Sequence, residues 1–195
     1  MKLTAVKSTI CGLLLFGSVA QVSAQTADAI NVVTTAVPFL RISPDARAGG
    51  MGEVGIATSP DANSSFWNIG KVAFNESKAG AGITYTPWLK DLGLNDVYLL
   101  SAAGYVKVDD LSAISGSVRY FSLGNIQFTD NLGNDLSTFR PREFGVDFGY
   151  SRKLSDKVGV GVGLKFISSN LAGGTSVGGN TYKTGTTVAG DLGFY

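Results

Sequence analysis

In residues 143–169, apolar residues alternate with small or polar ones in two stretches separated by a short polar turn. This pattern restricts the fold more than any other feature of the chain. In each half an apolar residue follows every small or polar one, and the apolar set is Phe144, Val146, Phe148, Tyr150, Val158, Val160, Val162, Leu164 and Phe166. Strict alternation predicts two β-strands with one apolar face. A soluble sheet turns that face to a core, whereas a transmembrane barrel turns it to lipid and keeps small or polar residues inside.

The first 24 residues have the features of a cleaved signal peptide. Lys2 and Lys7 precede a short apolar run at 10–19, and small residues end the segment at Ala24, so cleavage is expected before Gln25. The apolar run is too short to cross a membrane as a helix. Export from the cytoplasm is therefore predicted.

The residue inventory excludes several classes of chemistry. The chain has no His, and its one Cys, Cys11, lies in the predicted signal peptide. Disulfides, thiolate chemistry, His-based triads and His or Cys metal sites are therefore excluded from the mature chain, and we expect no cofactor, no metal and no enzymatic activity. Of the 16 basic residues, loss of Lys2 and Lys7 leaves 14 against 15 acidic ones. This balance, without basic clusters, argues against nucleic acid as a partner.

Residues 25–78 do not have the pattern of barrel strands. Pro and Gly interrupt every longer period, so we predict compact loop with about one helical turn, and one short strand is considered at Asn31–Phe39. The run Gly50-Met51-Gly52-Glu53-Val54-Gly55 satisfies G-x-G-x-x-G, but the strand before it and the helix after it that a nucleotide site needs are not predicted. We interpret these glycines as permitting tight turns and close backbone approach.

From Ala79 onward the alternation is sustained. Strands are predicted at 79–86, 97–107, 112–122, 143–153, 158–168 and 184–195, close to the roughly 9–11 residues that a tilted membrane strand needs. Their connections alternate between long ones, at 87–96, 123–142 and 169–183, and short ones, at 108–111 and 154–157. Outer-membrane barrels have short periplasmic turns and long extracellular loops. The chain is therefore predicted to be an all-β transmembrane antiparallel β-barrel, with the first strand starting at the periplasm and 123–142 outside the cell.

Four charged residues fall on the inward side of this pattern. Asp147 and Lys165 become direct cross-strand neighbours if the hairpin pairing is centred on Asp156 in an odd-numbered loop. Arg119 and Asp191 continue the alternation of sign on the flanking strands. We predict an inward ladder of charges with a structural role, which neutralises the lumen and anchors whatever fills it.

Glycines share the inward side of the predicted strands. They are Gly80, Gly82, Gly145, Gly149, Gly159, Gly161, Gly163 and Gly193. A wall without side chains lets another backbone pack closely, and residues 25–78, which we call the hatch segment, are the obvious candidate. The alternative, that the glycines relieve curvature strain in the sheet, stays open.

Six strands are too few for a closed barrel, since outer-membrane barrels begin at about eight. An open edge in lipid would leave unpaired backbone groups. Either the chain is the N-terminal part of a longer barrel, or the hatch segment supplies two more strands. We favour the first, because the Pro and Gly density of the hatch segment is unsuited to strands.

The run Ser43–Asn68, SPDARAGGMGEVGIATSPDANSSFWN, followed by a first strand near Ala79, resembles the PorV branch of the PorV/PorQ family. These are outer-membrane barrels of the type IX secretion system of Bacteroidetes-like bacteria, related in fold to the FadL long-chain fatty-acid transporters. The resemblance covers Val37–Tyr195 and departs at Ile69-Gly70, where related FadL-like chains often have Pro and Ala. The family-motif residues that carry it are Asp45, Arg47, Gly50, Met51, Gly52, Trp67 and Asn68.

The resemblance implies a FadL-like barrel of about 14 strands with an N-terminal hatch, of which this chain would hold roughly the first half. It also implies an outer-membrane location in contact with membrane lipid and lipopolysaccharide. Proteins of this family receive cargo through its C-terminal domain as it leaves the large translocon barrel subunit, which is SprA/Sov-like. They then shuttle it to the attachment complex that links it to surface lipopolysaccharide.

Three functions are open at this point. A secretion subunit would bind partners through extracellular loops, and the loop 123–142 offers two aromatic anchors and two charged rim residues, which are Phe128, Phe139, Arg140 and Arg142. A FadL-type channel for hydrophobic compounds would need an apolar pocket, for which the candidates, equally suited to packing between hatch and wall, are Phe39, Leu40, Phe66 and Trp67. An outer-membrane enzyme would have to work without the His of the usual acyl-hydrolase triad.

Overall fold

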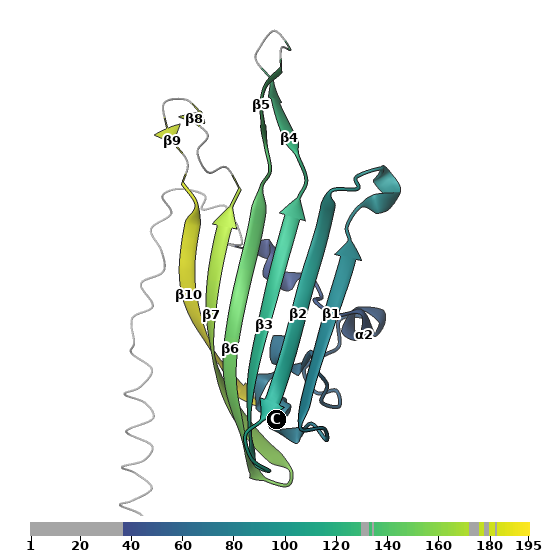
Figure 1. Ribbon diagram of the computed structural model, residues 1–195, viewed down its shortest axis with the longest axis vertical. Helices are drawn as coiled ribbons and strands as arrows, with labels where there is room; N and C mark the ends of the chain where they lie inside the picture. Colours follow the sequence, from purple (N-terminus) through teal and green to yellow (C-terminus); the bar gives the residue numbers. More distant parts are fainter. Residues whose placement is uncertain (1–36, 130–132, 134, 172–175, 178–179, 182) are drawn as a thin grey trace, which may run out of the picture. The chain divides into compact units, whose positions relative to one another are not determined.

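The computed structural model describes residues 37–129, 133, 135–171, 176–177, 180–181 and 183–195. Its main element is a six-stranded antiparallel sheet in the order β1-β2-β3-β6-β7-β10 (Figure 1). The strands are β1 (Ala79–Pro87), β2 (Val97–Lys107), β3 (Ser112–Leu123), β6 (Arg142–Ser155), β7 (Val158–Asn170) and β10 (Gly185–Phe194). All twelve ends lie within two residues of the predicted ones, and the all-β class is confirmed. Within the described ranges, no helix has the length and apolarity needed to cross a membrane.

The β6–β7 hairpin has the predicted register but a different turn. Asp147 lies directly opposite Lys165, as expected from a pairing centred on Asp156. The register then shifts by one residue between Lys153 and Ser155, so that Leu154 is the extra residue of a β-bulge. The predicted odd-numbered loop is therefore wrong: the bulge absorbs one residue and leaves a two-residue turn of Asp156 and Lys157.

The long connections contain structure that the alternation did not predict. The β1–β2 connection holds the 3-10 helix η4 (Lys90–Leu92), and the β7–β10 connection holds β8 (Ser176–Val177) and β9 (Asn180–Thr181). The prediction of a loop throughout 123–142 is wrong, because β4 (Ile126–Thr129) and β5 (Asp135–Phe139) form a separate hairpin. Gly124 and Gly133 both have φ +83°. Gly124 separates β3 from β4, and Gly133 lies between β4 and β5, at the tip of the hairpin. Figure 1 shows this hairpin extending beyond the ends of β3 and β6.

The described part of the hatch segment contains four short helices joined by loops and covers one face of the sheet (Figure 1). Its elements are η2 (Pro38–Arg41), α2 (Ala46–Gly50), α3 (Ser64–Trp67) and η3 (Ile69–Phe74). The strand considered at 31–39 is wrong at Pro38 and Phe39, because these residues begin the 3-10 helix η2. Residues 31–36 and the predicted signal peptide lie outside the described residues. Residues 37–78 contain no strand, so this part of the hatch segment adds none to the sheet.

The core lies between the hatch segment and the sheet. Phe39, which is 1% exposed, packs in one cluster with four residues of the covered face, Val97, Leu99, Phe121 and Ile167. A second cluster joins Val72 and Ala73 of η3 to the strand residues Tyr105 and Ala113. The covered face is therefore apolar where the hatch segment rests on it, which the prediction of a small or polar inner wall did not include.

The opposite face of the sheet exposes its apolar side chains. Exposure reaches 77% at Ile83, 67% at Leu164 and 89% at Leu192. Between the cross-strand pairs Ser112–Arg152 and Ser122–Arg142, every outward position except Ser168 and Thr186 carries glycine or an apolar or aromatic side chain. We call this surface the apolar band: Ala79, Ala81, Ile83, Tyr85, Leu100, Ala102, Gly104, Val106, Ile114, Gly116, Val118, Tyr120, Phe144, Val146, Phe148, Tyr150, Val162, Leu164, Phe166, Val188, Gly190 and Leu192.

Candidate functional site

Two of the family-motif residues, Asp45 and Trp67, connect the two ends of the Ser43–Asn68 run by a hydrogen bond. Asp45 caps the N-terminus of α2, where its Oδ1 accepts a hydrogen bond from Ala48 N at 2.6 Å. Its Oδ2 accepts another from the indole Nε1 of Trp67 at 2.7 Å, although Trp67 is 22 residues further along the chain. Because Asp45 is buried, both bonds replace water that the carboxylate has lost. Asp45 and Trp67 therefore serve the folding of the hatch segment.

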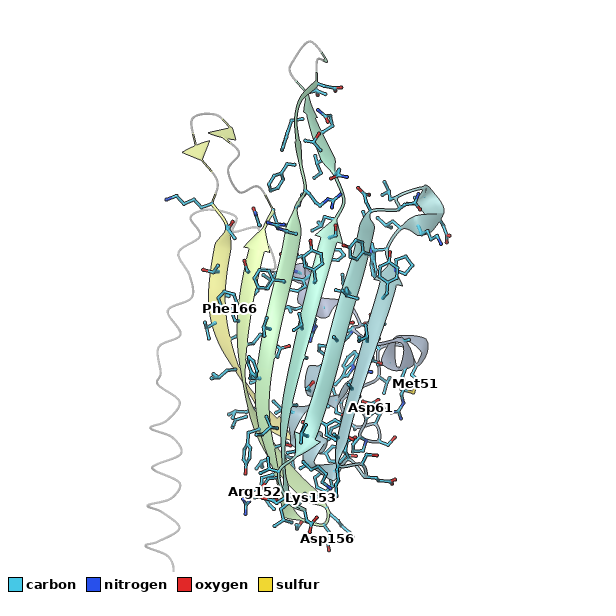
Figure 2. The ribbon with its side chains drawn as sticks, in the orientation of Figure 1. Met51, Asp61, Arg152, Lys153, Asp156 and Phe166 are labelled. Atoms are coloured by element: carbon cyan, nitrogen blue, oxygen red, sulfur yellow. The ribbon has the colours of Figure 1, made fainter. Side chains whose placement is uncertain are left out.

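Arg47 links α2 to the following loop. It forms an ion pair with Asp61, with Nη1 2.8 Å from Oδ2, and Nη2 donates to Ser59 Oγ at 2.7 Å. Asp61 also accepts from Asn63 N at 3.0 Å, which orders the turn before α3. Met51 lies nearby and is exposed; Figure 2 shows Met51 and Asp61 on the β1 side of the molecule.

The glycines of the G-x-G-x-x-G run serve packing within the hatch segment. Gly50 is the last residue of the short α2 helix, so the run follows a helix where a dinucleotide site would have a strand. A Cβ on Gly55 would overlap the indole ring of Trp67. This arrangement agrees with the interpretation of the run as turns and close backbone approach.

Lys71 is a buried cation that the sequence patterns did not single out. It is 1% exposed, and its Nζ donates to Gly55 O at 2.5 Å and to Thr58 Oγ1 at 3.1 Å. Burial lowers the pKa of Lys71 below 10.5, and nearby Asp61 partly opposes this shift. Only the contact between η3 and the loop 55–58 reveals the role of Lys71, since nothing in its sequence neighbourhood marks it as buried.

Replacement of Lys71 by Met is expected to loosen the hatch segment. The methionine removes the ammonium donor from Gly55 O, which keeps only the hydroxyl of Thr58 at 3.1 Å, and from Thr58 Oγ1, and this loss costs about 1–3 kcal/mol. Amide hydrogen exchange in residues 52–75 should accelerate by about fivefold to a hundredfold. The pKa of Lys71 is lower in the folded than in the unfolded protein, so folding becomes more favourable as the pH rises toward 10.5. Exchange protection in the wild type should therefore rise over this pH range. The variant should lack this rise.

The matched control is Lys78→Met, since Lys78 is exposed immediately before β1. Exchange in this control should match the wild type. Unchanged or slower exchange in Lys71→Met would mean that the cost of burying the charge exceeds the value of its hydrogen bonds, which would contradict the assigned role.

The glycine wall is where η3 meets the sheet. A Cβ on Gly149 would overlap the side chain of Ile69, and one on Gly161 would lie 2.6 Å from Ile69 Cγ2 and 2.8 Å from Gly70 N. Gly193 is equally close, 2.7 Å from Gly70 N. These glycines admit the backbone of η3 against the strands, which confirms that the wall packs against the hatch segment.

Asn68 joins the hatch segment to β10. Its Oδ1 accepts from Gly70 N at 3.0 Å and so caps η3. Its Nδ2 donates to Phe194 O at 2.9 Å, a bond between residues 126 positions apart in the sequence. Asn68 is thus both a helix cap and a tether between the hatch segment and the sheet.

Three of the four ladder charges come together on the covered face. Lys165 Nζ lies 3.0 Å from Asp191 Oδ2 and 3.7 Å from Asp147 Oδ1. Arg119 departs from the predicted ladder, because within the described part of the chain no carboxylate lies within 4 Å of it. Its Nη1 instead donates to Leu40 O at 2.9 Å, and its guanidinium lies 4.6 Å from the centre of the Phe66 ring. Arg119 therefore anchors the hatch segment, as the predicted structural role requires.

Three further polar residues, Ser117, Glu143 and Ser169, belong to this face and were not predicted. Ser117 Oγ donates to Asp147 Oδ2 at 2.8 Å, and Ser169 Oγ donates to Glu143 Oε1 at 2.6 Å. Glu143 is buried. It shares the inward parity of Asp147, so a stricter use of the alternation would have found it.

A cavity of about 340 Å³ lies between the hatch segment and the charged part of the sheet. Its walls combine Phe66, Trp67 and Ile69 of the hatch segment with Asp147, Lys165 and Asp191. Phe39 and Leu40 do not line it; Phe39 is buried in the core, where Leu40 packs beside it. Among the described residues, no group of three or more acidic, Cys or His side chains is placed to hold a metal ion.

The candidate partner-binding residues lie on or beside the β4–β5 hairpin. Phe128 and Phe139 are half-buried on β4 and β5. Arg140 Nε donates to Asn125 Oδ1 at 3.0 Å, across the base of the hairpin. Arg142 is exposed at the start of β6. The four residues therefore lie at one end of the sheet, far along the strands from the β6–β7 turn.

Comparison with known proteins bears on the whole of this arrangement. A protein-family model described as Type IX secretion system protein PorV matches residues 24–195, which include the hatch segment and all six strands of the sheet. A search of curated proteins finds no match.

Proposed function

Since the chain belongs to the PorV family of type IX secretion system proteins, we propose that it is a non-enzymatic outer-membrane subunit that binds secreted cargo. The family match confirms the resemblance carried by the Ser43–Asn68 run. Family membership makes the chain a component of the type IX secretion system. The location, the cargo step and the partners are the proposal.

The apolar band is the observation that carries the membrane location. It holds no charged side chain across six strands, and a soluble sheet would not expose such a surface. At one end, Tyr98 lies with its ring centre 5.4 Å from that of Tyr85 and 6.2 Å from that of Tyr120. At the other end are Tyr150 and Phe194. Two aromatic girdles around an apolar belt are typical of transmembrane barrels.

The free sheet edges support closure into a barrel. In the described structure, β1 and β10 each pair with a strand on one side only. Unpaired backbone groups in lipid cost several kcal/mol each. We therefore propose a closed FadL-like barrel of about 14 strands, to which this chain contributes the N-terminal part, with the hatch segment in the lumen.

The β4–β5 hairpin is the proposed cargo-binding element. In the proposed orientation the two-residue β6–β7 turn is periplasmic and the hairpin is extracellular. There it would receive the C-terminal domain of cargo leaving the SprA/Sov-like translocon barrel, before delivery to the attachment complex at the lipopolysaccharide surface.

Substitution of Phe128 and Phe139 by Ser is expected to weaken cargo capture. Aromatic anchors commonly contribute about 2 kcal/mol or more at protein interfaces, so the double variant should lower capture at least tenfold. Capture of a purified cargo C-terminal domain by the purified full-length protein measures this. Thr129→Ala, on the same hairpin, should bind as the wild type does. Undiminished capture by a folded double variant would remove the two phenylalanines from the interface.

Deletion of the gene separates cargo transport from the second candidate function, a FadL-type channel. That candidate is favoured by the cavity of about 340 Å³ with its lining of Phe66 and Trp67. We expect loss of surface-attached secreted proteins with normal uptake of long-chain fatty acids. Normal secretion with impaired fatty-acid uptake would contradict the role in cargo transport and support the channel function.

A further inference from the structure

The apolar band contains a hollow over β1, β2 and β3. Its volume is about 680 Å³. The floor is made by Ala81, Gly104 and Gly116, which lie opposite one another on adjacent strands. Val106 is exposed and bounds the hollow toward the β2–β3 turn. The hollow forms because, along the row of Ala81, Gly104 and Gly116, the only side chain is the methyl group of Ala81.

A second hollow lies beside the first, over β6 and β7. Its volume is about 450 Å³, and Tyr150, Val162 and Leu164 line it. Ile114 and Phe148 line both hollows and form a ridge between them. Phe148 is 66% exposed, so the ridge stands clear of the floor on either side.

A cationic group marks the end of the ridge. Arg152 pairs across the strands with Ser112, one step toward the turns from the pair of Tyr150 with Ile114. Tyr150 and Arg152 both direct hydrogen bonds to Ser112 Oγ, at 3.0 and 3.4 Å. Arg152 is exposed, and no carboxylate in the described part of the chain lies within 4 Å of its guanidinium. Asp109, in the neighbouring turn, accepts instead from Leu111 N. Figure 2 shows Arg152 at the end of the sheet with Lys153 and Asp156.

We propose that this surface binds one diacyl phospholipid, with one acyl chain in each hollow and the phosphate on Arg152. The inference rests on the proposed membrane location. Two apolar hollows flanking a single ridge match two chains joined at one headgroup. The guanidinium lies at the edge of the apolar band, the depth at which headgroup phosphates lie, and pairs with phosphate through charge-assisted hydrogen bonds. A flat protein partner would rest on the Phe148 ridge and leave the hollows empty.

The test measures lipid retained by the full-length protein after purification in mild detergent. Native mass spectrometry follows the addition of dioleoylphosphatidylglycerol, and of its single-chain lyso form as a probe of the second hollow. Gly116→Leu fills the first hollow, and the nearest atoms to an added Cβ there lie at 3.7 Å, so the backbone tolerates it. Arg152→Gln removes the charge. Val118→Leu, on the same strand and face but outside both hollows, is the control.

The wild type should retain one diacyl lipid per chain. Gly116→Leu and Arg152→Gln should each lower retention about tenfold, Val118→Leu should leave it unchanged, and the lyso form should bind more weakly than the diacyl form. Equal retention in all variants would show ordinary annular lipid only and overturn the site. Membrane fractionation of the same strains separates the two proposals: a chain found in the outer membrane but without a retained lipid fails only this inference.

Discussion

Val118→Arg is expected to destabilise the folded protein in a bilayer by about 2–4 kcal/mol. Val118 lies near the middle of the apolar band, where an outward arginine would have to enter hydrocarbon. Equilibrium unfolding by guanidinium in lipid vesicles measures the change. A defect in assembly should also appear in cells, as loss of the protein from the outer membrane.

The matched control is Val108→Arg. Val108 lies in the β2–β3 turn beyond the band and is 61% exposed, against 45% for Val118. In water the two substitutions would have nearly equal effects, within about 0.5 kcal/mol. In a membrane Val108→Arg should cost no more than about 1 kcal/mol. Equal effects at both positions would contradict the membrane location of the band.

Gly161→Val is expected to displace the hatch segment from the sheet. Even the first added carbon would lie 2.6 Å from Ile69 Cγ2 and 2.8 Å from Gly70 N, and Gly70 cannot move without its neighbours in η3. Such overpacking costs about 1–3 kcal/mol, and the two branches of valine add to it. Trypsin should then cleave the hatch segment at Arg47 or Lys71 at least tenfold faster than in the wild type.

Gly190→Val is the control for this substitution. Gly190 lies on the outward face of β10, where an added Cβ would meet nothing closer than 3.8 Å. Both changes replace glycine by valine within a strand, so they share any effect of β-propensity. Equal rates of cleavage in the two variants would show that the glycine wall does not hold the hatch segment.

The strands and their pairing could be predicted because a period of two is a local property. Alternation located the six strands, and parity together with a pairing centred on Asp156 placed Asp147 opposite Lys165. The turn between them could not be predicted in the same way, since the bulge at Leu154 changes the loop without changing the register of the strands beyond it. The β4–β5 hairpin was missed because its strands are short and separate from the main sheet.

The interior of the hatch segment was less accessible to prediction, because contacts between distant residues determine it. Asp45 meets Trp67, and Asn68 meets Phe194, but the spacing of these residues carries no period that would indicate a contact. Lys71 follows the same rule, since only folding brings it to the carbonyls of the 55–58 loop. Resemblance identified the run that contains most of these residues, and the structure shows that they hold the hatch segment together.

Co-isolation of cargo with the tagged full-length protein from outer membranes tests the proposed function most directly. Mild cross-linking before solubilisation would preserve complexes, and mass spectrometry would identify them. We expect secreted proteins that carry their C-terminal domain to co-isolate, and the same proteins without that domain to be absent. Co-isolation independent of the C-terminal domain, or no cargo at all from a correctly inserted protein, would contradict the role in cargo binding.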